Sequence, residues 1–375
     1  MTWKIPLYKV FVDGEDNRAV NKVIQRGMDW AIGPEIEKFE KKIANYIGIK
    51  YCIAFNSGTS AGHAALLAIN INSGEVIVPS FTFVSTANWP LMVNAKPKFV
   101  DIEEENFGLN PKRVKLEITK NTKAIIPIHY GGLPCKIVEI NRIARNKKIT
   151  LIEDCAESLG AKIKGVSVGT FGQMSIFSFA PNKILTTGEG GAICTDSRKI
   201  FEKLQLIRSH GRKVNENYFK TSQLPNYISI GYNWRMSSMT AALGLSQFDK
   251  LDRIIQLRRR HARFYVLKLK KINEIKLPDE PKDHLHVYQL FTIQLKNNLI
   301  RNELQKFLAS RGIMTKVFFE PIHLSNFYKK SGFGKKSLPN TEKTSQTVLS
   351  LPIFPGLKSE EIRHICDSIK EFFQN

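Results

Sequence analysis

One lysine stands in a sequence context that suits covalent chemistry. Residues 177–191 read as the end of a strand, a turn that presents Lys183, and a glycine-rich stretch from Gly188 to Gly191. Glycine lets backbone approach a ligand closely, and an unprotonated lysine amine can form a Schiff base with an aldehyde. Most lysines are only solvated charges. The position of Lys183 between Ser178 and the glycine run singles it out as a candidate nucleophile.

Acidic residues follow another predicted strand. The run from Leu151 to Ser158 contains Asp154 and Glu157 directly after a β-rich stretch. Ligands of open α/β sheets bind at the carboxyl ends of strands. An aspartate there can keep a pyridine ring nitrogen protonated, and such a ring stabilises a carbanion next to an imine. The alternative interpretation is that Asp154 caps the following helix.

Two further segments combine polar side chains with a helix start or a turn. In residues 56–61 a strand ends and a helix opens, so Thr59, Ser60 and free backbone N–H groups would point at an anion. Hydroxyl side chains at a helix start also cap free amides without any ligand. Residues 231–236 include Asn233 and are equally compatible with a turn beside a buried tryptophan.

The elements that must position these residues form an α/β pattern. Between about residues 35 and 200, short β-rich runs alternate with helical patterns, which is typical of a mostly parallel sheet. Helices are expected at Ser60 to Ile69 and at Ile137 to Asn146, among others. Strands are expected at Tyr51 to Phe55, Glu75 to Val78, Lys98 to Asp101, Ala124 to Ile128, Thr150 to Glu153, Met174 to Phe179 and Gly191 to Thr195.

The rest of the chain predicts a second, smaller α/β domain. A long helical pattern, roughly Ser238 to Lys271, would connect the two domains. Beyond it the sequence predicts a strand, a helix, a second strand and a last helix, at Tyr288 to Leu295, Leu299 to Arg311, Met314 to Phe319 and Ser359 to Phe373. The predicted domains are residues 1–245, and residues 246–375 with the connecting helix.

Length and composition are those of a globular protein. The 375 residues are 42% hydrophobic and 24% charged, and no apolar run reaches the length of about 18 residues that suggests a membrane span. The first six residues lack the features of a secretory signal, so a cytoplasmic protein without membrane association is expected. The five cysteines are scattered and form no CxxC pair, which argues against a disulfide framework and a metal site and indicates buried thiols.

The formal net charge of +22 requires weighing a nucleic-acid-binding function, because Lys and Arg neutralise phosphates. The densest basic stretch, Arg258 to Arg260 with lysines after it, lies in a helical pattern, and no nucleic-acid-binding motif accompanies it. The preferred interpretation is a solvated basic surface that attracts anionic substrates.

Taken in order, these segments resemble the DegT/DnrJ/EryC1/StrS family of sugar aminotransferases. The local sequence around Glu157 and Lys183 is most similar to the perosamine-synthase branch of this family. The resemblance covers nearly the whole chain. Besides the four segments above, it rests on residues 33–35, 79–83, 127–132, 208–211, 318–323 and 351–352, which read GPE, PSFTF, PIHYGG, RSHG, FFEPIH and LP.

The resemblance implies an aspartate-aminotransferase-like fold of type I and a dependence on pyridoxal 5'-phosphate. Lys183 matches the lysine that bonds the cofactor and acts in catalysis, and Asp154 matches the aspartate on its ring nitrogen. The substrates implied are glutamate and a nucleotide-linked keto sugar.

Further positions are carried over from the same resemblance. Thr59 and Ser60 fall on the phosphate-binding helix start, and Ser178 matches a hydroxyl that also reaches the phosphate. Phe83 lies where the family stacks an aromatic ring on the cofactor, and Asn233 where it sends a phosphate ligand from the other subunit. A homodimer with a shared active site is therefore expected.

One position departs from the commonest family pattern, since many members carry Gln where this chain has Glu157. An acid would interact differently with the ring oxygen of the cofactor, and some 4-keto-sugar enzymes are similar here, which favours amination at C4. Phe319 and His323 are candidates for the acceptor pocket by resemblance, or else a core aromatic and a strand-end histidine. The alternatives are a 3-keto-sugar aminotransferase, a non-catalytic family-like regulator, and the nucleic-acid binder.

Overall fold

The computed structural model describes residues 3–213, 222 and 224–374. Met1 and Thr2, the start of the segment in which no secretory signal was found, lie outside the described residues. At the centre is a seven-stranded sheet of order β1-β9-β8-β5-β4-β2-β3. Its strands are β1 (Tyr51–Phe55), β2 (Glu75–Pro79), β3 (Lys96–Val100), β4 (Thr122–Ile125), β5 (Thr150–Asp154), β8 (Met174–Ser178) and β9 (Gly191–Thr195).

The sheet is mostly parallel, because only β9 runs antiparallel to both of its neighbours, β1 and β8. Its strands are almost wholly buried, as expected of a sheet covered by helices on both faces. Each predicted strand of the core is present, with ends shifted by at most a few residues. The predicted α/β fold class with a mostly parallel seven-stranded sheet is therefore confirmed.

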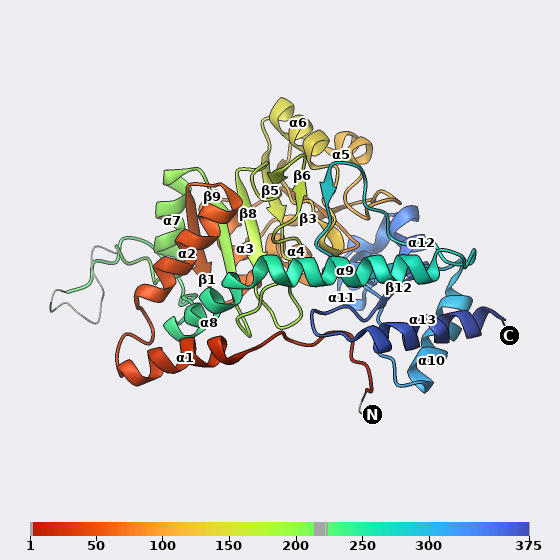
Figure 1. The fold of residues 1–375 in the computed structure, drawn as a ribbon. Helices are drawn as coiled ribbons and strands as arrows, with labels where there is room; N and C mark the ends of the chain where they lie inside the picture. Colours follow the sequence, from red (N-terminus) through yellow and green to blue (C-terminus); the bar gives the residue numbers. More distant parts are fainter. Residues whose placement is uncertain (1–2, 214–221, 223, 375) are drawn as a thin grey trace.

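Helices surround the sheet on both sides (Figure 1). Those that follow or precede its strands are α1 (Gly14–Arg26), α2 (Pro34–Ile47), α3 (Gly58–Ala68), α4 (Val84–Met92), α5 (Pro111–Glu117), α6 (Ile137–Lys147), α7 (Arg198–Arg208) and α8 (Ser238–Asp249). Short strands β6 (Lys162–Ile163), β7 (Val166–Ser167) and β10 (His284–Leu285) form a small separate sheet.

A second core is built around the antiparallel pair β11 (Phe291–Gln294) and β12 (Val348–Leu351). Ile5, near the start of the chain, also packs into this core and bridges Ile313. The helices of this part are α10 (Asn298–Ser310), α11 (Asn326–Lys330), α12 (Pro339–Thr347) and α13 (Ser359–Gln374).

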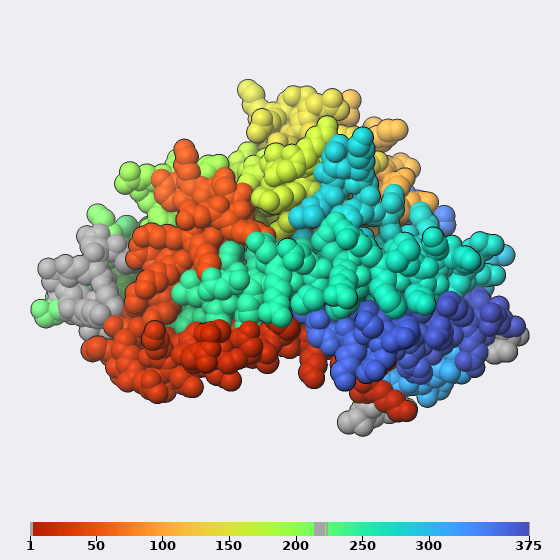
Figure 2. All heavy atoms as spheres, viewed as in Figure 1, coloured from red at the N-terminus to blue at the C-terminus, as the bar shows by residue number. Residues whose placement is uncertain are grey.

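Helix α9 (Leu251–Leu269) joins the two cores and crosses one face of the molecule (Figure 1 and Figure 2). Its first half contributes Ile254 and Ile255 to the core beside the large sheet, and its second half contributes Tyr265 and Leu269 to the second core. This arrangement suits the predicted connecting role, while the domain boundary near residue 245 stays a prediction.

Two sequence predictions about these elements are wrong. The expected single helix from Ser238 to Lys271 is two helices, α8 and α9, divided at Lys250. The ammonium of Lys250 pairs with Asp16 at 2.6 Å and Asp13 at 2.9 Å, which ties the junction to α1.

The expected strand from Met314 to Phe319 is also wrong, because its backbone pairing is limited to isolated contacts. Lys316 and Ser350 exchange two hydrogen bonds, of 3.2 and 2.8 Å, and the Met314 N–H donates to Ile5 O at 2.9 Å. Met314, Phe318 and Phe319 instead line a cavity described below, so the chain follows the cavity wall and not the sheet.

All five cysteines are buried and free, which confirms the prediction of buried thiols. Among the described helices, none combines the length and the apolar character needed to cross a membrane.

Candidate active site

A cavity of about 460 Å³ opens at the carboxyl ends of the central strands. Strand β5 brings Asp154 to it, the turn after β8 brings Lys183, and the start of α3 brings Thr59. Of the predicted catalytic and cofactor-binding residues, six line the cavity: Thr59, Phe83, Asp154, Glu157, Ser178 and Lys183. Segments more than 120 residues apart in the sequence thus meet as the α/β pattern predicts.

Lys183 and Glu157 face each other inside this cavity. The Lys183 Nζ lies 3.6 Å from Glu157 Oε1, and the side chains are 13% and 5% exposed. The other oxygen, Glu157 Oε2, accepts a hydrogen bond of 2.8 Å from the backbone N–H of Gly131. Gly131 lies in the short 3-10 turn Tyr130–Gly132 with φ 60°, a left-handed conformation that glycine adopts without strain. The turn therefore fixes the carboxylate beside the amine.

Asp154 is the last residue of β5, and its buried carboxylate accepts two hydrogen bonds. Its Oδ2 accepts from Thr86 Oγ1 at 2.8 Å, and its Oδ1 accepts from the Ala156 N–H at 3.1 Å. Burial raises the pKa of Asp154, while these two hydrogen bonds and the charge of Lys183 lower it. A cationic group placed in the cavity next to this carboxylate would stabilise its charged form.

Thr86 is a site residue that the sequence reasoning missed. It lies in the first turn of α4, after the carboxyl end of β2, and its hydroxyl also lies 3.0 Å from Thr82 Oγ1. The available signal was the hydroxyl-rich stretch Thr82 to Thr86 directly after a predicted strand.

The start of α3 approaches Ser178 closely. Ser57 caps the helix by accepting from the Ser60 N–H at 3.1 Å, and the first-turn residues Gly58 and Thr59 belong to the cavity lining. A Cβ atom at Gly58 would lie 3.0 Å from the Cβ of Ser178, so glycine keeps the space between helix and strand open. The hydroxyl of Ser60 donates to Asn56 at 2.6 Å, and Ser60 is not part of the lining.

Aromatic residues complete the walls. Phe83 precedes α4 and is 58% exposed, with its ring available to a flat ligand. Phe319 also lines the cavity, as expected for a residue of the acceptor pocket. His323 does not, because it is fully buried and hydrogen-bonded to Ser80 Oγ at 2.7 Å.

Asn233 lies outside the lining of this single-chain cavity. It is exposed and bridges Ser209 in the segment before α8. The predicted role of Asn233 requires a second copy of the chain and stays a prediction.

A buried cluster beside β5 has the residue types of a metal site, namely His129, Glu153 and Cys155. His129 Nε2 lies 3.1 Å from Glu153 Oε2. Glu153 also accepts backbone N–H groups of residues 169, 171 and 172 at 2.7 to 2.8 Å. These bonds give the carboxylate a structural role, in which it ties the loop after β7 to the sheet.

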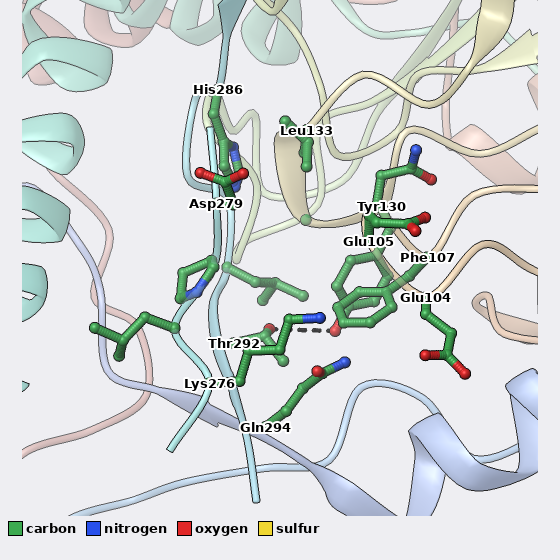
Figure 3. A pocket seen from close by; sticks show the side chains of 15 residues that line it. Glu104, Glu105, Phe107, Tyr130, Leu133, Lys276, Asp279, His286, Thr292 and Gln294 are labelled. Atoms are coloured by element: carbon green, nitrogen blue, oxygen red, sulfur yellow. Dashed lines mark hydrogen bonds between the residues drawn. The ribbon is translucent and has the colours of Figure 1, made fainter. Parts of the chain in front are cut away.

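A second cavity, of about 220 Å³, contains none of the predicted site residues. Tyr130 and Phe107 lie edge to face on one wall, with ring centroids 5.1 Å apart, and His286 lies on the opposite side in Figure 3. Tyr130 donates a hydrogen bond to the carbonyl of Phe318, which lines the first cavity. The hydrogen bond between Tyr130 and Phe318 therefore connects the walls of the two cavities.

Comparison with known proteins places this geometry in a family. Residues 11–370 match the model of the DegT/DnrJ/EryC1/StrS aminotransferase family. GDP-perosamine synthase of Escherichia coli O157:H7 is 35% identical over 99% of both chains. A pleiotropic regulatory protein of Geobacillus stearothermophilus is 36% identical over 94% of this chain and 93% of that protein.

A solved structure, S. venezuelae DesV in complex with a ketimine intermediate, superposes with a TM-score of 0.90 at 30% identity, and all of both chains is covered. Aminotransferases of this family depend on pyridoxal phosphate. This chain, a transaminase by descent and by fold, belongs to the DegT/DnrJ/EryC1/StrS aminotransferase family.

Proposed function

We propose that this protein transfers an amino group from glutamate to a nucleotide-linked keto sugar, at C4 of a 6-deoxy sugar. The observation that carries the proposal is one cavity in which the amine of Lys183 lies 3.6 Å from Glu157 and shares the lining with the buried carboxylate of Asp154. The similarity to GDP-perosamine synthase favours a 4-keto sugar as acceptor.

The residues of the cavity fit pyridoxal phosphate. Phosphate suits the first turn of α3, because N–H groups at a helix start favour anions and Gly58 and Thr59 share the cavity lining with Ser178. A protonated ring nitrogen suits Asp154, because burial raises the pKa of this carboxyl and a cation would offset its charge. The aldehyde suits the amine of Lys183, and the ring face suits the exposed ring of Phe83.

When bound, the cofactor supplies an aldehyde that carries the amino group and a ring that withdraws electrons. In our proposal the Nζ of Lys183, once free, takes a proton from the substrate carbon and later returns one. Asp154 would hold the proton on the ring nitrogen, and the hydroxyl of Thr86 keeps the Asp154 carboxylate in place. Glu157 keeps its place beside Lys183 through the Gly131 N–H.

We further propose a homodimer in which Asn233 enters the cavity of the other subunit. The exposure of Asn233 in the segment before α8 supports this. So does the exposed Trp30, whose carbonyl accepts a hydrogen bond of 2.8 Å from the N–H of Ser238, the first residue of α8. A mixture of inactive Lys183→Ala and Asn233→Ala proteins should regain activity, because one site in each mixed dimer has both residues intact. Failure to regain activity after subunit exchange would contradict the shared site.

The acceptor is tested by supplying the purified, cofactor-loaded protein with glutamate and a nucleotide-linked 4-keto-6-deoxy sugar. We expect 2-oxoglutarate and the 4-amino sugar in equal amounts. Preferential turnover of a 3-keto sugar would favour the first alternative acceptor. Cofactor binding without release of 2-oxoglutarate from glutamate, whichever keto sugar is supplied, would favour a regulator, a possibility raised by the similarity to the pleiotropic regulatory protein.

A further inference from the structure

We infer that Gln289 is a positioning residue for Lys183, acting through the backbone carbonyl of Asn182. Gln289 lies in residues 286–290, here called the bridging segment, which enters the second core at β11. Its side-chain amide donates a hydrogen bond to Asn182 O, the carbonyl directly before Lys183. The inference rests on the proposed role of Lys183.

The turn that carries Lys183 is anchored after the lysine, where Ile184 and Leu185 are buried in the core, and is less constrained before it. Within it, the Lys183 N–H donates to Ala180 O at 3.0 Å, and Pro181 at its tip is exposed. For the Asn182 carbonyl, the Gln289 amide is the donor found in the part of the chain that the structure describes. Losing this donor would loosen the peptide group directly before Lys183 and let the amine shift within the cavity.

The amide of Gln289 stands at a place where stability alone favours an apolar side chain. Gln289 is only 3% exposed, and its Oε1 is buried without a hydrogen-bond partner among the described residues. An unpaired buried carbonyl costs free energy. The amide is therefore best explained by what its N–H group holds in place.

The same bridging segment also positions the partner of Lys183. The Leu290 N–H donates to Gly131 O at 3.1 Å, and the Val287 N–H donates to Gly132 O at 3.2 Å. Gly131 in turn donates to Glu157 Oε2. The bridging segment thus helps to position both Lys183 and Glu157, whose side-chain atoms lie 3.6 Å apart.

The bridging segment is itself held by the connecting helix α9. The buried guanidinium of Arg258 donates through Nη1 to the carbonyls of Tyr288 at 3.1 Å and Gln289 at 3.4 Å. The same nitrogen reaches Ile353 O, in the second core, at 3.0 Å. The position of Lys183 is therefore coupled to the packing of the second core against α9.

The test replaces Gln289 with Leu, which has a similar size and no donor, and follows hydrogen exchange in the cofactor-free protein. Amides of residues 180–187 should exchange about five- to tenfold faster, the factor expected for one net hydrogen bond. Gln305→Leu is the matched control, because the Gln305 amide also donates to a backbone carbonyl, that of Thr315 at 3.3 Å, away from the turn. Exchange in residues 180–187 should not change in the control.

In the cofactor-loaded protein, Gln289→Leu should lower kcat by a similar factor and leave KM for glutamate and for the keto sugar unchanged. If Gln289→Leu does not fold, Gln289→Met carries the same test with a more flexible side chain. Unchanged exchange of residues 180–187, or an unchanged kcat, would overturn the inference. Because exchange is measured without substrate, a protein that lacks transaminase activity would refute the proposed function and leave this test intact.

Discussion

At the scale of single residues, the cavity places two buried carboxylates beside one amine. Asp154 and Glu157 are 2% and 5% exposed and both line the cavity. Asp154 accepts two hydrogen bonds, and Glu157 accepts one and lies 3.6 Å from the Lys183 amine. Buried charges are costly unless they are paired. Burial of these carboxylates is therefore expected to lower the stability of the cofactor-free protein, and this effect can be measured.

We predict that Asp154→Asn stabilises the cofactor-free protein while it removes activity. Because burial raises the pKa of Asp154, its contribution to stability is complete at low pH and is lost as pH rises through the raised pKa. The melting temperature of the variant should therefore exceed that of the parent at pH 7, and the difference should disappear in acid. Transaminase activity should fall by about 10² to 10⁴-fold, the range of a lost proton-holding group.

A variant that melts below the parent at pH 7, with normal folding, would show that the carboxylate is stabilising in the free protein. Full activity in the same variant would remove Asp154 from the site.

The sequence predicted those residues that follow strands at the carboxyl edge of the sheet. Lys183 and Asp154 could be singled out because strand, turn and residue type are local properties of the chain, whereas the role of Ser178 came from the family resemblance. Thr86 and Gln289 were missed, because each acts through one hydrogen bond to a residue 68 or 107 positions away in sequence. Such pairs depend on tertiary packing, which a single sequence does not display.

At the scale of elements, alternation of β-rich and helical stretches was sufficient for the seven core strands. It failed where a side-chain interaction or a cavity wall decides the local structure. The expected long helix is divided at Lys250, whose ammonium pairs with Asp13 and Asp16 at the start of α1, and Met314, Lys316, Phe318 and Phe319 line a cavity where a strand was expected.

The contact between the Tyr130–Gly132 turn and the bridging segment yields an element-scale prediction. Gly132 has φ 93°, and a Cβ atom there would lie 2.6 Å from Val287 Cγ2 and 3.1 Å from the Gln289 nitrogen. Gly132→Ala should therefore destabilise the protein by about 1–3 kcal/mol or more, through backbone strain and overlap.

Chemical denaturation should measure this loss, and Gly165→Ala provides a control with positive φ, 79°, and no atom within 4 Å of the added Cβ. Equal losses in the two variants would show that strain alone is responsible and that the contact with Val287 is unimportant.

At the scale of the whole molecule, one buried histidine in the bridging segment should affect acid stability. His286 Nδ1 accepts the Tyr288 N–H at 3.0 Å, and burial lowers the pKa of His286 to about 3. The unfolded chain takes up this proton below a pH of about 6.5, and the folded chain does not until pH falls much further. Stability should fall by about 1.4 kcal/mol per pH unit between these values on account of this one group.

In His286→Gln the dependence of unfolding free energy on pH between 4 and 6 should be less steep by one proton, as measured by urea unfolding. The exposed His364 provides the control, since His364→Gln should leave the slope unchanged. An unchanged slope in His286→Gln would mean that the imidazole is protonated in the folded protein.

The global charge of +22 also acts at this scale. The two substrates that we propose, a nucleotide-linked keto sugar and glutamate, are both anions, and a basic surface attracts anions.

The most direct test of the account concerns the amine of Lys183. The purified protein is loaded with pyridoxal phosphate, reduced with borohydride, digested and analysed by mass spectrometry, with the visible absorption recorded before reduction. We predict that the cofactor is attached at Lys183, and that the attachment, the visible absorption band and the release of 2-oxoglutarate are all lost in Lys183→Ala. Attachment to another lysine, or an unchanged absorption band in Lys183→Ala, would contradict the account.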